Sequence, residues 1–126
     1  LRIEPGTETL VNVRTNFYTE PQPFSRSIDL LGFAVDLEAT PTTYTWIHGD
    51  GTTSRTSDPG SPYPDLAVTH RYRDPSARVS PRVDVTYEVR YRVDGGPWLP
   101  LSQTLTAQGP AGTLSVTEAA PVLTAR

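Results

Sequence analysis

Residues 83–93, VDVTYEVRYRV, constrain the fold more than any other stretch of the chain. Every odd position holds valine or tyrosine, and every even position holds a polar or charged residue. This strict period of two, rich in β-branched and aromatic residues, predicts a long β-strand with one buried face and one solvent face. A helix would instead repeat its apolar residues every three or four positions.

The segment after this strand predicts a hairpin. Asp94-Gly95 is a dipeptide that readily adopts the positive φ angles of a two-residue hairpin turn. Trp98 then begins the expected return strand. Pro100 lies early in that strand and has no N–H to donate, so it predicts an edge strand or a bulge.

The rest of the chain continues the β pattern. Thirteen prolines and nine glycines interrupt nearly every window long enough for a helix. We expect further strands within residues 9–19, 42–51, 67–72 and 113–118, a polar loop over 52–66, and a frayed tail at 119–126. Seven or eight strands joined by frequent turns predict an all-β antiparallel sandwich.

Residues 27–40, SIDLLGFAVDLEAT, predict a second hairpin with its turn at Gly32-Phe33. The register then pairs apolar residues across the turn, Ile28 with Leu37 and Leu30 with Val35. It also sets Asp29 opposite Asp36, and a like-charge pair of this kind counts against it. The alternative is one continuous strand with a bulge at Gly32.

Composition excludes several classes of protein. A chain of 126 residues with 36% hydrophobic and 20% charged residues is typical of one soluble globular domain. The net charge is −3 and the arginines are scattered, so no nucleic-acid surface is expected. No apolar run approaches the roughly 20 residues that cross a bilayer. The absence of cysteine excludes disulfides and thiolate chemistry.

Three short motifs resemble the polycystic-kidney-disease (PKD) domain family. The family signature is Trp-Asp-Phe-Gly-Asp-Gly, followed by His-x-Tyr and by a strand that ends in Tyr-x-Val. The matching residues here are Trp46, Gly49, Asp50, Gly51, His70, Tyr72, Tyr87 and Val89. Ile47 and His48 depart from the pattern, because they stand where the family has aspartate and phenylalanine.

The chain is also similar to a group of small exported actinobacterial PKD-domain proteins, through its FYTEP, DPGSPYPD and VDGGPW segments. The resemblance implies a secreted or cell-surface Ig-like sandwich in one domain. Residues 1–34 would be an N-terminal strand extension packed on the sandwich, 35–118 the PKD-like core and 119–126 a tail. Trp46 would be buried between the sheets, beside Tyr72 and Tyr87 or Tyr44. No particular activity is implied.

Two sets of residues are candidate metal ligands. His48, Asp50 and His70 are of the types that bind zinc, but their spacing matches no known metal motif. We favour packed, hydrogen-bonded histidines, with Asp50 accepting backbone N–H bonds in its turn. The carboxylates of Asp50, Asp58, Asp65 and Asp74 would suit Ca²⁺, although aspartate also commonly begins turns. We therefore predict no resident metal or cofactor.

Catalysis is not expected. Ser54, His70 and Asp50 supply the residue types of a hydrolase, but no Gly-x-Ser-x-Gly elbow is present. A small sandwich also rarely forms the cleft that paired catalytic carboxylates need.

The candidate binding residues are Tyr63 and Trp98, which fall in or near loops. Exposed aromatic rings bind proteins and glycans well, but the same two side chains could instead cover the ends of the core. We predict a non-catalytic extracellular or cell-surface module for protein or glycan interaction or for spacing. The alternatives are a carbohydrate-binding module with coplanar aromatic rings and a structural subunit of a surface assembly.

Overall fold

The computed structural model describes residues 1–75 and 77–118, and the predicted tail at 119–126 lies outside them. The described part contains eleven β-strands and no helix. The all-β prediction is therefore confirmed, with more strands than the expected seven or eight. With no helix in residues 1–75 and 77–118, there is also no helix in that part that could cross a membrane.

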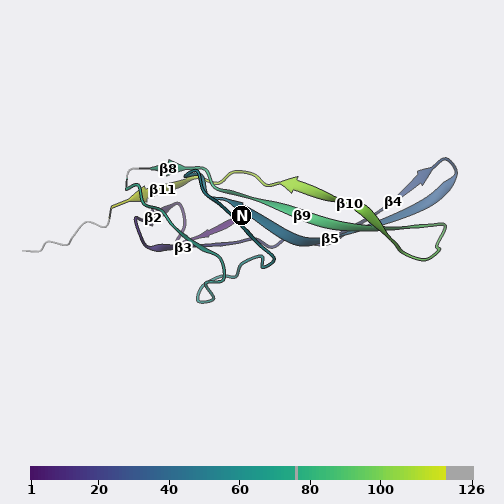
Figure 1. The fold of residues 1–126 in the computed structure, drawn as a ribbon, viewed down its shortest axis with the longest axis horizontal. Helices are drawn as coiled ribbons and strands as arrows, with labels where there is room; N and C mark the ends of the chain where they lie inside the picture. Colours follow the sequence, from purple (N-terminus) through teal and green to yellow (C-terminus); the bar gives the residue numbers. More distant parts are fainter. Residues whose placement is uncertain (76, 119–126) are drawn as a thin grey trace, which may run out of the picture.

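One long sheet runs through the molecule (Figure 1). Its centre is formed by β5 (Phe33–Ile47) and β9 (Arg82–Val93), which pair antiparallel along nearly their whole length. The flanking strands are β4 (Phe24–Leu30) beside β5 and β10 (Leu99–Gln108) beside β9. At the other end of β5, the short β6 (Thr53–Thr56) adds a further strand.

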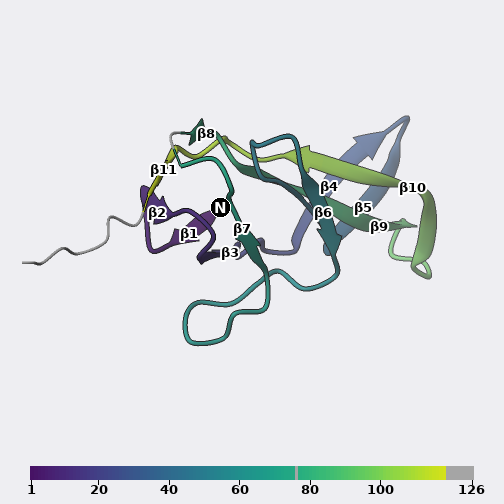
Figure 2. The same cartoon turned by 60° about the vertical axis from the view of Figure 1, so that its left-hand side comes forward.

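Two small sheets lie together at one end of the long sheet (Figure 2). The first has the order β1 (Arg2–Glu4), β3 (Arg14–Tyr18) and β7 (Thr69–Arg71). The second has the order β2 (Glu8–Leu10), β11 (Leu114–Thr117) and β8 (Arg78–Val79), and its β2–β11 pair is parallel.

The core lies where the small sheets meet the long one. Trp46 and Val83, partners across β5 and β9, face Phe17 of β3 and Leu114 of β11 within a single buried cluster. Trp46 is 1% exposed, stacks on Tyr44 at 6.2 Å and donates its Nε1–H to Thr56 Oγ1. The predicted burial of Trp46 is confirmed.

Only half of the long sheet is covered in this way. We call residues 43–47 of β5 and 82–87 of β9 the core half. The outer half consists of β4, residues 33–41 of β5, residues 88–93 of β9 and residues 99–105 of β10. In Figure 1 the outer half extends as a single layer beyond the two small sheets.

The single strand predicted within residues 9–19 is wrong. The chain forms β2 and β3 instead, and the two strands belong to different sheets. A turn at residues 11–13 separates them, with Asn12 at φ 60°. This turn brings the buried hydroxyls of Thr9 and Thr15 within 2.6 Å of each other, so that they bond together.

The hairpin at 27–40 is present, but its predicted register is wrong. The turn residues are Leu31 and Gly32, with φ of 52° and 87°, and Ile28 pairs with Val35. The two positive φ angles of the turn therefore fall on Leu31 and Gly32, and Phe33 begins β5 as the partner of Leu30. The observed register also sets Asp36 opposite Ser27, whose hydroxyl donates to it at 2.7 Å.

Two further boundaries differ from those predicted. The strand expected at 42–51 is the end of β5, which passes Pro41 through a local irregularity between Pro41 and Thr43. Residues 53–56, predicted as loop, form β6. β6 contains only polar residues, so no alternation in hydrophobicity reveals it.

The hairpin after residue 93 is confirmed. Asp94 and Gly95 have φ of 50° and 73°, and Gly96 N–H donates to Val93 O at 2.9 Å. β10 is an edge strand, and its register with β9 shifts between Pro100 and Thr104. Pro100 therefore occupies the kind of position that its missing donor predicts.

Candidate functional site

His48 directly follows the last residue of β5, and its ring is buried. It is 3% exposed, and its ring lies 3.9 Å from that of His70 in a parallel stack and 5.4 Å from that of Phe17. Its Nε2 shares a hydrogen bond with Ser54 Oγ. Burial, with His70 adding to it, lowers the pKa of His48 to about 4. The ring is therefore neutral at pH 7.

Asp50 and His70 tie the β5–β6 turn to β7. His70 Nε2 lies 2.7 Å from Asp50 Oδ2, while the backbone N–H and the hydroxyl of Thr52 both donate to Asp50 Oδ1. Although burial raises the pKa of Asp50, the hydrogen bonds from Thr52 and His70 outweigh it and hold that pKa below its usual value. Both oxygens of the Asp50 carboxylate therefore already have hydrogen-bond partners.

The structure brings His48, Asp50 and His70 together without forming a metal site. The two histidine rings are parallel within 8°, so their nitrogen lone pairs lie in separate planes and do not converge on one point. Among residues 1–75 and 77–118, no three His, Cys, Asp or Glu side chains form a group that could hold a metal ion. Of the Ca²⁺ candidates, Asp58 accepts Gly60 N–H in its own loop.

Three of the signature residues, Gly49, Gly51 and Tyr72, lie beside this cluster. The Tyr72 hydroxyl donates to His48 O at 2.7 Å, and burial raises its pKa. Gly49 and Gly51 have φ of 89° and 88°. A Cβ on Gly49 would lie 3.0 Å from Val79 Cβ and from Ser80 N, whereas the space beside Gly51 is open.

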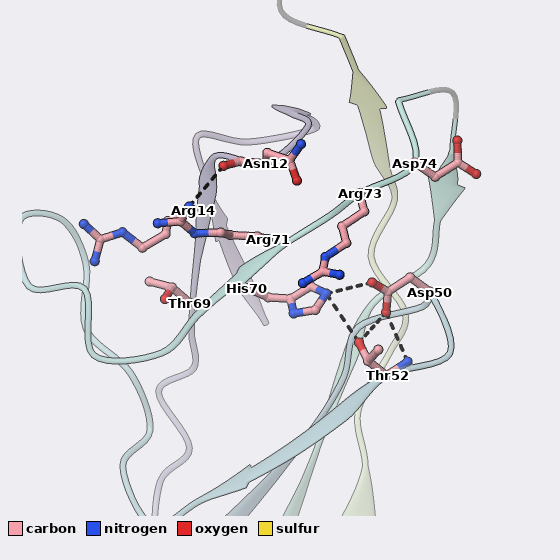
Figure 3. Close-up of a pocket in the computed structure, with 9 residues that line it drawn as sticks. All are labelled: Asn12, Arg14, Asp50, Thr52, Thr69, His70, Arg71, Arg73 and Asp74. Carbon is pink, nitrogen blue, oxygen red and sulfur yellow. Dashed lines mark hydrogen bonds and ion pairs between the residues drawn. The ribbon is translucent and has the colours of Figure 1, made fainter.

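An open hollow of about 1140 Å³ lies beside the Asp50–His70 pair (Figure 3). We call it the arginine hollow. Its walls come from β3, β7, the β5–β6 turn and the segment after β7. The lining residues are Asn12, Arg14, Asp50, Thr52, Thr69, His70, Arg71, Arg73 and Asp74.

Three arginines and two aspartates, Asp50 and Asp74, line the hollow, so its formal charge is positive by one with His70 neutral. Arg14 of β3 and Arg71 of β7 are direct cross-strand partners. Arg73 follows two residues later and extends toward the His70–Asp50 pair (Figure 3). Like charges directly opposite each other destabilise a sheet. The pair is therefore unfavourable for the sheet, and Arg71 is held by one hydrogen bond that its Nη1 donates to Asn12 O at 3.5 Å.

The arginines of the long sheet are arranged differently. Arg82 pairs with Asp84, Arg90 with Glu38, and Arg92 with Asp36. Within the described residues, no carboxylate lies within ion-pair distance of Arg14, Arg71 or Arg73. The sequence analysis missed this cluster, because Arg14 and Arg71 are far apart in the chain and neither lies in a motif.

The β6–β7 loop, which carries Tyr63, and the β9–β10 turn, which carries Trp98, lie on separate parts of the molecule (Figure 1). Tyr63 is 74% exposed in the β6–β7 loop, beside β1, where its N–H donates to Glu4 Oε1. Trp98 is half-buried in the β9–β10 turn, with the guanidinium carbons of Arg90 and Arg92 4.4 and 4.6 Å from its ring centroids. Neither residue belongs to the core cluster, and together they form no stacking platform.

The outer half carries an apolar face that nothing in the described part of the chain covers. We call this surface the outer face. It lies on the same side of the sheet as Trp46, since directly paired residues point to the same side. Its apolar members are Phe24, Ile28, Leu30, Phe33, Val35, Leu37, Val89, Tyr91, Val93, Leu99 and Leu105.

No protein-family model, curated protein or solved structure matches the chain.

Proposed function

We propose that this chain is a non-catalytic binding module of the cell surface or extracellular space, an Ig-like sandwich of the PKD type. Its arginine hollow holds the acidic groups of a protein or glycan partner. The observation that carries the proposal is the direct pairing of Arg14 with Arg71, joined by Arg73 and lacking a carboxylate partner among the described residues.

The charges of the hollow favour an anion. Guanidinium groups present a planar fork of donors that matches carboxylate and sulfate oxygens. A bound anion would relieve the repulsion between Arg14 and Arg71, which is otherwise unfavourable. Asp50 competes little for these arginines, because His70 and Thr52 already occupy its oxygens.

The same geometry argues against catalysis. A histidine that activates a hydroxyl uses one ring nitrogen toward the hydroxyl and the other toward the orienting carboxylate. Here a single atom, His70 Nε2, meets both Asp50 and the Thr52 hydroxyl. The Thr52 hydroxyl itself donates to Asp50. The location at the cell surface follows from the resemblance to the PKD family.

Calorimetric titration with polygalacturonate and with a polyglutamate peptide tests this proposal. We expect one of the two to bind, with an affinity that falls as salt concentration rises. Arg14→Ala and Arg71→Ala should each weaken binding at least tenfold. The arm that binds identifies the partner as glycan or protein.

Arg55→Ala is the matched control, because Arg55 is exposed on β6 outside the hollow and its loss changes the net charge equally. It should leave binding unchanged. Equal weakening by Arg55→Ala would mean diffuse attraction of a polyanion and would contradict the proposal. So would the absence of binding in both arms at low salt.

A further inference from the structure

The outer face is too large and too apolar for a surface that remains in water. Seven of its members are between 39% and 55% exposed, among them Phe24, Leu30 and Phe33. At about 150–250 Å² for a fully exposed large ring and somewhat less for an aliphatic side chain, the face leaves on the order of 700 Å² of apolar surface in water. Single exposed apolar residues need no explanation, but contiguous patches of this size mark interaction sites.

The reverse side of the same strands is an ordinary solvent surface. Its ladder on β5 and β9 consists of ion pairs, Asp36 with Arg92 and Glu38 with Arg90. Trp98, the large ring in this region, is covered by those two arginines. The sheet is therefore built to be covered on the outer face alone.

The outer face continues the surface that the core already uses. Along β9 the apolar side runs without interruption from Val83 and Val85, which are buried, through Tyr87 to Tyr91 and Val93. In the core half, the two small sheets form the second layer. In the outer half, the described chain supplies no second layer.

We propose that a second copy of this chain covers the outer face, in a two-fold symmetric dimer. A stable two-protein interface buries about 800 Å² on each partner, and the outer face supplies an area of that order. Two equal twisted sheets pack well face to face, about 10 Å apart, as the layers of a sandwich. In a two-fold dimer the same surface of each chain meets its copy, so the surface must be complementary to itself. The outer face has one charged residue, Arg26 on the edge strand β4, so two copies meet with little charge repulsion.

The position of the core determines the direction of the pairing. Within each chain the two small sheets stand on the same side of the long sheet as the outer face, at one end of it. If both chains ran in the same direction, their cores would occupy the same space. The two long sheets therefore run in opposite directions, and each outer half lies against the outer half of its partner, between the two cores.

Sedimentation equilibrium of the whole chain over a hundredfold concentration range tests the proposal. We expect a species of twice the 13.8 kDa chain mass. Ile28→Lys, on the outer face, should weaken the dimer at least tenfold because it buries an unpaired charge. Ser27→Lys is the matched control, since Ser27 is adjacent on β4 and faces Asp36 on the other side of the sheet.

A wild-type chain that stays at 13.8 kDa throughout would overturn the proposal, even if another protein were found to bind the same face. Equal weakening by Ile28→Lys and Ser27→Lys would also overturn it. Because Ile28→Lys could disturb the β4–β5 hairpin, Leu105→Lys on the opposite edge strand β10 provides a second outer-face variant, and circular dichroism verifies folding. This dimer is independent of the arginine hollow, so either proposal can fail alone.

Discussion

At the scale of single residues, His48 places a titratable aromatic ring in a buried position just after β5. A phenylalanine there would fill the same aromatic slot. Histidine keeps the packing against Phe17 and adds the bond to Ser54, but it brings a titratable ring into the core. Its lowered pKa couples the stability of the fold to pH.

We predict that the chain loses stability as pH falls from about 6.5 to about 4. In this window the unfolded chain binds a proton at His48 and the folded chain does not, so protonation favours unfolding. The full shift corresponds to about 3 kcal/mol of unfolding free energy. Urea denaturation at fixed protein concentration should show this loss in the wild type and a smaller one in His48→Phe. The same pH dependence in both proteins would show that the linkage arises elsewhere.

At the scale of elements, the β5–β6 turn joins the long sheet to the core. Gly49 and Gly51 both adopt the left-handed conformation, but for Gly49 the neighbouring backbone is close as well. The motif that suggested a turn thus contains two glycines with different constraints. Gly51 is required only for its positive φ, whereas Gly49 also leaves the space into which β8 packs.

We predict different costs for alanine at the two positions. Gly51→Ala should cost about 1–2 kcal/mol of unfolding free energy, because alanine is strained at this φ. Gly49→Ala should cost at least about 1 kcal/mol more, because its Cβ also presses on Val79 and Ser80. Guanidinium denaturation of the two variants measures the difference. An equal loss of unfolding free energy in the two variants would mean that Val79 and Ser80 move away from the new Cβ at no cost.

At the scale of the whole molecule, the long sheet has two halves with different surroundings. The core half packs against the two small sheets, and the core that they share contains Trp46, Tyr72 and Leu114, all of them at most 1% exposed. In the outer half every residue of β4 is exposed. Within one chain, cross-strand hydrogen bonds and ion pairs hold this half together without a core of its own.

We predict that the outer half opens locally in the monomer, because its amides are protected only by solvent-exposed ladders. In the Ile28→Lys variant, hydrogen exchange in β4 should be at least tenfold faster than in β3 and β11. In the wild type at high concentration, the same β4 amides should become protected. Uniform exchange across the long sheet in the variant would show that the sheet is stable without cover.

Local sequence patterns predicted much of the β structure. The alternation at 83–93 led to β9, and Asp94-Gly95 led to its turn. These predictions succeeded because strand pleating and turn angles depend on neighbouring residues alone. Two local predictions, the turn position of the 27–40 hairpin and the single strand assigned to 9–19, were wrong.

Tertiary structure alone decided what the surfaces became. The alternation along β9 is the same from Val83 to Val93, yet its first half is buried and its last residue is 40% exposed. Likewise, Arg14 and Arg71 carry no local signal of their pairing. An alternation of apolar and polar residues shows that one side of a strand is apolar. Which segment covers that side depends on residues distant in the chain, or on another chain. The sequence by itself therefore determined the strands and turns, and the packing of layers determined the arginine hollow and the outer face.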